Sequence, residues 1–336
     1  MNCLFFGESE KAFFKTEELT KIRKIDKPIY PRPYYDLLND KKFKYPVKQN
    51  KEIRILTCDI AIVGGKKNDA SAFELIQLIP QYNKKVFKGY QRIIGYMESM
   101  VGMHSELQAI RIRQLYDDLE CDYIVIDRQG NGISVYENLC KNLYDKERGV
   151  DYQAFNSINE EKMQSLCLVP GADKKIWTIS ATPEFNSQIA YLLKNDVTRG
   201  KIRLLVNKNE SYEYLSEFKD FVTQRAEIKA KLQAPYYQTD ALINEMVLLE
   251  SEINDDKKIK LKEQSGNRKD RYTSLAYGNY FANKLERKIL KKGKKTNIQD
   301  YCKINTLDNQ QINNNISPFG NNFGNPFGNS MNRRVF

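Results

Sequence analysis

The sequence predicts an α/β protein in which a mixed sheet is flanked by helices, and three observations lead to this fold class. The stretch 53–63, IRILTCDIAIV, is apolar at both odd and even positions, which is typical of a central strand covered on both faces. Two further strand-like segments follow at residues 70–79 and at about residues 91–97, and the three together predict an antiparallel meander. The apolar stretch 123–126 comes after an amphipathic helix at 105–119, and this order implies a right-handed crossover and a parallel neighbour.

The composition divides the chain into a strap, a main domain and a tail. Residues 1–50 predict a linker or strap that packs its aromatic side chains on the next domain, because the prolines of KPIYPRP exclude a regular helix. Residues 51–292 form the main domain. Residues 293–336 are rich in Asn, Gly and Phe and cannot bury enough apolar surface to become ordered, so we expect a disordered tail.

The second half of the main domain predicts helices separated by short strands. Thr182 followed by Pro183 is a helix start with Thr182 as the N-cap, and this helix stops near Gly200. The other predicted elements are helices at 133–144, 212–232, 236–252 and 269–290, and strands at 151–155, 202–206 and 258–262. Residues 169–179 favour no single state.

The composition indicates a soluble, globular and basic protein. Its 336 residues, 41% of them hydrophobic, are enough for a sizeable core, and its six cysteines lack a CxxC pair, which predicts reduced thiols and a cytoplasmic location. No apolar run approaches the roughly 20 residues that span a bilayer, and Glu8 and Glu10 stand where a signal peptide would be basic or apolar. The net charge of +11, interleaved with aromatic residues, predicts a polyanionic partner, nucleic acid rather than membrane. A merely basic soluble protein is the alternative.

Three aspartates stand where predicted elements of the sheet layer end or begin. Asp59 lies inside the first apolar strand, Asp127 ends the strand at 123–126, and Asp270 lies in the first turn of the final helix. A desolvated carboxylate costs several kcal/mol unless it is neutralised, paired or bound to a metal. If the strands of Asp59 and Asp127 are neighbours, their carboxylates converge, and oxygen ligands of this kind suit Mg²⁺ or Mn²⁺. The constellation predicts a metal site.

Each acid except Asp59 has a simpler alternative interpretation. Asp127, which precedes RQGNG, has the sequence context of an Asx-type turn residue. Asp270 near a helix N-terminus complements the helix dipole. Asp69, in the turn GGKKND, fits a solvated turn residue.

Several other chemistries are excluded by missing residues. His104 is the only histidine, which argues against a histidine-rich zinc site or a histidine general base. No GxxxxGK[ST] motif and no GxSxG motif occurs, and the GNG at 130–132 is too short for a dinucleotide fingerprint.

The ordered set of these motifs resembles the C-terminal nuclease domain of the large terminase subunit of tailed bacteriophages. The segments that carry the resemblance are TCDIAIVGGKKNDASAF, YIVIDRQGNGISVYENL and KDRYTSLAYGNYF, in that order. The resemblance extends over most of the chain, because FFGESEKAFFK is similar to the segment that follows the ATPase domain in this family. Any one segment is a weak signal, and their order is the stronger one.

The resemblance implies an RNase H-like fold and a metal-dependent endonuclease that cuts concatemeric phage DNA during genome packaging. Asp59, Asp127 and Asp270 match the three metal-binding acids of the family, and Asp69 matches an auxiliary acid found in some members. The implied partners are double-stranded DNA, the terminase ATPase part, the small terminase subunit and the portal protein, in the host cytoplasm. Two features depart from the family: Lys269 stands where some members have a histidine, and the Walker motifs are absent.

The acids suggest a two-metal mechanism. Two Mg²⁺ or Mn²⁺ ions roughly 3.5 to 4 Å apart would activate a water and stabilise the leaving oxygen, with Asp59 bridging both ions. Contacts to the DNA backbone are expected from basic residues near the acids and on the second hairpin, namely Lys84, Lys85, Lys88, Lys269 and Arg271.

Two alternative functions stay open at the level of sequence. One is a resolvase- or transposase-like nuclease of the same fold. The other is a DNA-binding or portal-docking module that keeps the fold without catalysis.

Overall fold

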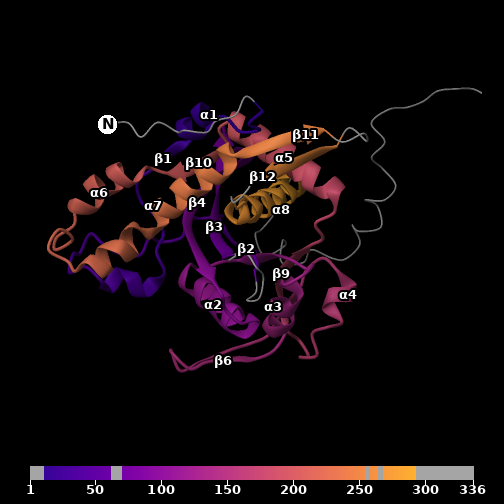
Figure 1. The fold of residues 1–336 in the computed structure, drawn as a ribbon. Helices are drawn as coiled ribbons and strands as arrows, with labels where there is room; N and C mark the ends of the chain where they lie inside the picture. Colours follow the sequence, from indigo (N-terminus) through magenta and orange to yellow (C-terminus); the bar gives the residue numbers. More distant parts are fainter. Residues whose placement is uncertain (1–10, 62–69, 254–257, 264–267, 293–336) are drawn as a thin grey trace, which may run out of the picture.

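An eight-stranded mixed sheet forms the centre of the protein (Figure 1). The computed structural model describes residues 11–61, 70–253, 258–263 and 268–292. The strands are, in their order across the sheet, β1 (Arg23–Ile25), β10 (Ile202–Leu205), β4 (Val86–Val101), β3 (Ala70–Asn83), β2 (Ile53–Asp59), β5 (Tyr123–Asp127), β9 (Asp173–Ile179) and β8 (Phe155–Ser157). Strands β2, β3 and β4 pair antiparallel, whereas the other neighbours are parallel. An antiparallel meander followed by parallel strands is the predicted RNase H-like arrangement, which is confirmed.

Helices cover both faces of this sheet. On one face, α8 (Asp270–Lys292) packs on β2 and β3, with α5 (Pro183–Thr198) beside it, and on the other face lie α2 (Ser105–Asp118) and α3 (Gly132–Leu139) (Figure 1). The remaining elements are α1 (Thr16–Lys21), η1 (Arg32–Asp36), α4 (Glu161–Gln164), α6 (Lys208–Ser216), α7 (Ala226–Val247) and the hairpins β6–β7 (Leu143–Asp145, Val150–Tyr152) and β11–β12 (Leu249–Ile253, Ile259–Glu263). Within the described ranges, none of the helices is long and apolar enough to cross a membrane.

Alternate residues of β2 pack in two different cores, as the apolar residues at both odd and even positions predict. Ile53 and Ile55 pack in the core beneath α8, whereas Leu56 and Cys58 pack in the core beneath α2 and α3. All residues of β2 are buried except the last, Asp59, which is half-buried. The strand therefore places a carboxylate where the buried part of the sheet ends.

Helix α8 lies unusually close to β2 because position 278 is glycine. A Cβ atom built on Gly278 would lie 2.2 Å from Cγ2 of Thr57, a distance that side chains do not tolerate. One helical turn earlier, the hydroxyl groups of Ser274 and Thr57 share a hydrogen bond of 2.8 Å. This close contact fixes the first turn of α8 relative to the end of β2.

Several predicted boundaries were wrong in the second half of the chain. The helix predicted at 133–144 ends at Leu139, because residues 143–145 pair with β7 and the Asp145 carboxylate accepts hydrogen bonds in the connecting turn. The strand predicted at 151–155 is two short strands, β7 and β8, and residues 173–179 form β9. The strands β3 and β4 extend well beyond the predicted 70–79 and 91–97.

The two helices predicted at 212–232 and 236–252 were also wrong. The first ends at Ser216, and the second begins at Ala226 and continues through Pro235. A proline removes a hydrogen bond inside a helix, which is why the sequence favoured a break there. The Tyr30 hydroxyl donates to the Leu232 carbonyl in the turn before Pro235, so packing from the N-terminal segment supports the helix at this point.

The described part of the N-terminal segment belongs to the same fold. Strand β1 pairs parallel with β10, and Tyr30 and Phe43 are buried in the core beneath α2. The turn that contains Asp69 and the tail 293–336 lie outside the described residues.

Candidate active site

The fold brings Asp59 and Asp127 to one edge of the sheet. Strands β2 and β5 are parallel neighbours with Cys58 opposite Ile126, so the next residue of each strand, Asp59 and Asp127, leaves the sheet at the same end. Asp270 is the first residue of α8, the helix that packs on β2. The three acids named by the sequence therefore come from three neighbouring elements.

The electrostatics of Asp59 reflect this proximity. Burial raises the pKa of the Asp59 carboxyl well above its usual range, and the negative charges of Asp270, Asp127 and Glu245 raise it further, whereas Lys269 lowers it. No hydrogen bond or ion pair from a described residue compensates this carboxylate. Asp59 is thus a desolvated acid among like charges, the situation that a bound cation relieves.

Asp127 is held in place by two donors. The backbone N–H of Gln129 donates to its Oδ1 at 2.9 Å, and the Tyr277 hydroxyl donates to its Oδ2 at 3.1 Å. Burial raises the pKa of Asp127, and these two hydrogen bonds oppose the rise. The bond from Gln129 is the Asx-type turn that the sequence indicated, so Asp127 is a turn residue that also faces the site.

The start of α8 is anchored by Glu245, a residue that sequence reasoning missed. Its Oε2 accepts hydrogen bonds from the backbone N–H groups of Arg271 (2.9 Å) and Tyr272 (3.1 Å), and its Oε1 pairs with the Arg271 guanidinium. A carboxylate in this position satisfies donors that the first turn of a helix leaves open. Glu245 lies on α7, far away in sequence, so no local pattern could have identified it.

A fourth acid, Glu74, lies on the strand next to Asp59 and was also missed. It is opposite Thr57 in the β2–β3 register, it has no exposed surface, and within the described chain neither of its carboxylate oxygens has a hydrogen-bond partner. Burial raises its pKa well above the usual range, Glu245 raises it further, and Arg271 lowers it. An acid inside the apolar run 70–79 is the same signal that singled out Asp59.

The donor set has the chemistry of a hard divalent cation site without being a closed cage. Among the residues that the structure describes, no three His, Cys, Asp or Glu side chains are already placed to hold a metal ion together. The half-buried Asp59 carboxylate, which has no hydrogen-bond or ion-pair partner among the described residues, fits the requirement of Mg²⁺ or Mn²⁺ for charged oxygen ligands. A cation would have to draw Asp127 and Asp270 towards Asp59. Asp69 lies outside the described residues.

The basic residues predicted to contact DNA lie in two different places. Lys84 and Lys85 form the exposed β3–β4 turn, with Lys88 next to it, whereas Asp59 is opposite Ala72 near the other end of β3. At about 3.3 Å per residue, this turn is roughly 40 Å along the strand from the acids. The structure therefore places these three lysines far from Asp59 and Asp127, at the opposite end of the sheet.

The other two predicted DNA contacts lie beside the acids. Lys269 pairs with Glu263 at 2.7 Å and remains partly exposed. Arg271 is bound internally, since it pairs with Glu245 and its Nε donates to Gln238 at 2.7 Å. Of these two, Lys269 lowers the pKa of Asp59.

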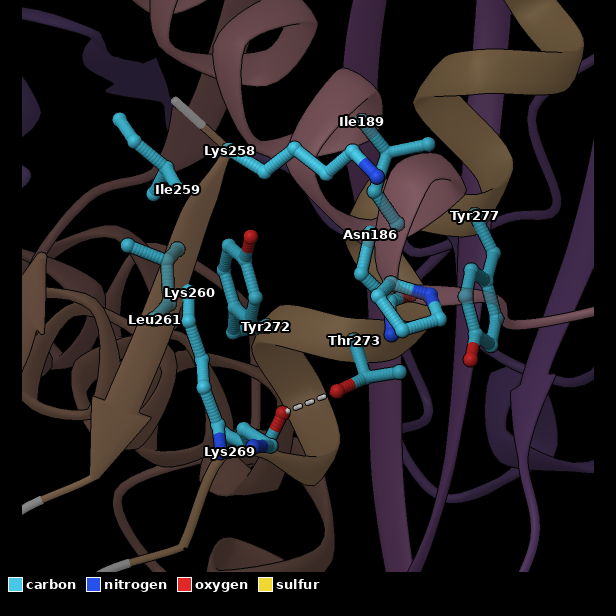
Figure 2. A pocket seen from close by; sticks show the side chains of 11 residues that line it. Asn186, Ile189, Lys258, Ile259, Lys260, Leu261, Lys269, Tyr272, Thr273 and Tyr277 are labelled. Carbon is cyan, nitrogen blue, oxygen red and sulfur yellow. Dashed lines mark hydrogen bonds between the residues drawn. The ribbon is translucent and has the colours of Figure 1, made fainter. Parts of the chain in front are cut away.

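A cavity of about 350 Å³ adjoins the acids. Figure 2 shows its walls, which come from the first turns of α5, from β12 and from the first turns of α8. Two of its lining residues also contact the acid group: Lys269 precedes Asp270, and Tyr277 donates to Asp127.

The sheet order and the acids at its edge thus define an RNase H-like domain with a candidate catalytic centre. No protein-family model and no curated protein matches this sequence. Similar solved structures include the large terminase nuclease from thermophilic phage G20c with bound magnesium, at 14% identity and a TM-score of 0.45 over 81% of this chain and 98% of that one. The nuclease domain of the large terminase subunit gp2 of bacterial virus Sf6 has 11% identity and a TM-score of 0.38 over 74% of this chain and 96% of that one.

Proposed function

We propose that this chain is a divalent-metal-dependent endonuclease that cuts double-stranded DNA, and that it serves as the nuclease part of a phage large terminase during genome packaging. The observation that carries the proposal is the Asp59 carboxylate at the end of β2, which no described residue pairs with and whose pKa is raised by burial and then by Asp270 and Asp127. The motif resemblance supports the packaging role, in which concatemeric DNA is the substrate. By the same resemblance, the ATPase part, the small subunit and the portal protein are partners.

The residues of the chain supply the geometry of the reaction. Asp59, whose pKa both other acids raise, would hold two divalent ions, Mg²⁺ or Mn²⁺, together with Asp127 and Asp270. Bound ions of this kind activate a water and stabilise the leaving oxygen of the phosphodiester. Tyr277 orients Asp127, and Glu245 fixes the helix start that carries Asp270.

A second candidate is a DNA-binding or docking module without catalysis. It is favoured by the lack, among the described residues, of three side chains already arranged around a cation position. Both candidates predict DNA binding by the basic surface, since the chain carries a net charge of +11.

Metal-dependent cleavage of plasmid DNA by the full chain separates the two candidates. We expect cutting with Mn²⁺ and a loss of about 1,000-fold in Asp59→Asn, which corresponds to about 4 kcal/mol of barrier. The matched control is Asp151→Asn, an exposed aspartate on β7, which should cut as the wild type does. A second readout is the melting temperature, which Mn²⁺ should raise in the wild type and raise less in Asp59→Asn.

The outcomes are distinct. If Asp59→Asn cuts as fast as the wild type, the site is wrong. If the wild type binds DNA but neither cuts nor gains stability with Mn²⁺, the chain is the non-catalytic module.

A further inference from the structure

The cavity beside the acids combines apolar walls with positive charge. Tyr272 and Ile189 provide apolar surface, and Figure 2 shows the Tyr272 ring between the side chains of β12 and Asn186 of α5. Asn186 and Thr273 provide polar groups, and the Thr273 hydroxyl donates to the Lys269 carbonyl at 2.9 Å. A ligand with one flat, mostly apolar part and one polar edge would match these walls.

The charged groups at this cavity point to an anionic ligand. Its lining includes Lys258, Lys260 and Lys269 and no carboxylate. Lys269 pairs with Glu263 and Lys258 pairs with Glu184, while Lys260 forms no ion pair with any part of the chain that the structure describes. No carboxylate lines the cavity itself, so an anion would meet Lys260 directly and would compete with Glu263 and Glu184 for the other two lysines.

The position of the cavity relates this ligand to the DNA strand. Lys269 and Tyr277 line the cavity and also contact or adjoin the acids, so its occupant would lie next to a phosphate held at Asp59. A volume of about 350 Å³ falls at the lower end of the range of roughly 300 to 1,000 Å³ for small-ligand sites. It suits one nucleotide and excludes a base-paired duplex.

We propose that this cavity binds a single unstacked nucleotide of the strand being cut, one position away from the scissile phosphate. The base would lie against Tyr272 with its edge towards Asn186, and the phosphate would lie at Lys260 and Lys269. This inference rests on the proposed nuclease function and specifies its substrate as DNA that is locally opened. Unstacking costs a few kcal/mol, and contact between a base and an aromatic ring returns about 1 to 3 kcal/mol.

The test uses a duplex that contains 2-aminopurine, a base whose fluorescence rises when it leaves the stack. The full chain with Asp59→Asn and Mn²⁺ binds this duplex without cutting it. We expect a rise of at least about threefold on saturation, in keeping with an extruded base. Adding Asn186→Phe, which fills the cavity from an exposed position, should abolish most of the rise while fluorescence anisotropy shows that DNA remains bound.

The matched control is Gln188→Phe, an exposed residue on the same helix outside the cavity, which should keep the full rise. Bound DNA without a rise, or an equal rise with Asn186→Phe, overturns the proposal. A thermal shift with free deoxyadenosine monophosphate, without a signal from DNA, would assign the cavity to a free nucleotide and also overturn it. Failure of the nuclease function is recognised separately, because the wild type would then not cut DNA with Mn²⁺ whatever the fluorescence shows.

Discussion

The two ends of α8 bury charged groups in opposite ways. At its first turn, Asp270 lies near Asp59, whose carboxylate receives no hydrogen bond from the described residues and is repelled by its neighbours. Farther along the helix, the fully buried Arg92 pairs with Asp196 at 2.5 Å and with Glu286 at 3.5 Å. This second group, here called the Arg92 network, consists of Arg92, Asp196, Lys201, Asn279, Asn283 and Glu286.

The Arg92 network and Asp59 show two roles of buried charge, one that stabilises the fold and one that is suited to binding a ligand. In the Arg92 network, Asp196 accepts from Arg92 and from the amides of Asn279 and Asn283, so its charge is compensated inside the fold. Such a network ties β4, α5 and α8 together. At the start of the same helix, Asp270 lies near Asp59, whose carboxylate receives no hydrogen bond or ion pair from the described residues, which is the condition for binding a cation.

The largest stability effect is expected for Arg92→Leu, because it leaves the buried carboxylates of Asp196 and Glu286 without the Arg92 guanidinium. Breaking a buried ion pair from one side costs about 3 to 5 kcal/mol, since the partner charges remain buried. Urea unfolding measures this cost. The control, Arg199→Leu at the exposed end of α5, should change the free energy of unfolding by less than about 0.5 kcal/mol. A cost for Arg92→Leu as small as that of the control would show that the network is not structural.

Glu74→Gln should have the opposite sign, because it removes a buried acid whose carboxylate oxygens have no hydrogen-bond partner in the described chain. The folded state raises the pKa of Glu74, so it keeps a proton that the unfolded state releases above its ordinary pKa of about 4.3. The free energy of unfolding therefore falls as pH rises from that value through the folded-state pKa. Gln carries no titrating proton and should remove this loss, with a gain of about 1 to 3 kcal/mol at pH 8 and little change near pH 4.

Urea unfolding in metal-free buffer at the two pH values measures the effect of Glu74→Gln. Glu213→Gln, an exposed change on α6, is the control and should leave the pH dependence as it is. An unchanged slope in Glu74→Gln would mean that this carboxyl is ionised in the folded protein.

The smallest effect is expected for Tyr277→Phe, which deletes one hydrogen bond to Asp127. A hydrogen bond to a charged acceptor contributes about 1.5 kcal/mol at the low end, so cleavage should slow by about 10-fold. The Mn²⁺ concentration for half-maximal rate should rise as well, because Asp127 loses its orientation. Tyr280→Phe, on the same helix and outside the acid group, should keep both values. Equal kinetics in Tyr277→Phe and wild type would remove Tyr277 from the site.

Much of the central sheet was predictable from the sequence because its signals are local. The apolar residues at both odd and even positions before Asp59 indicate a strand with two covered faces, and Thr182 with Pro183 fixes the start of α5. The buried charged residues that position α8, such as Glu245 and Arg92, were not predictable from local sequence patterns. Glu245 acts on a helix that begins 25 residues later, and Arg92 finds its partners on α5 and α8, so only the folded chain reveals them.

The helix break predicted between residues 232 and 236 also shows that local sequence rules fail where distant contacts act, because α7 continues through Pro235. The local rule against proline inside a helix is sound, but the Tyr30 hydroxyl from a distant segment donates to the Leu232 carbonyl and supports the continuous helix. Tertiary contacts therefore decided the boundary that local preference predicted wrongly.

Gly278, eight residues after Asp270 in α8, determines how close Asp270 lies to Asp59. Because a side chain there would collide with Thr57 and Ile76, any larger residue would lift α8 from the sheet, and Asp270 would move away from Asp59 with it. A shift at Gly278 would move the first turn of α8 as well, because both belong to one continuous helix. The distance between Asp59 and Asp270, which a cation would have to span, therefore depends on the lack of a Cβ atom at Gly278.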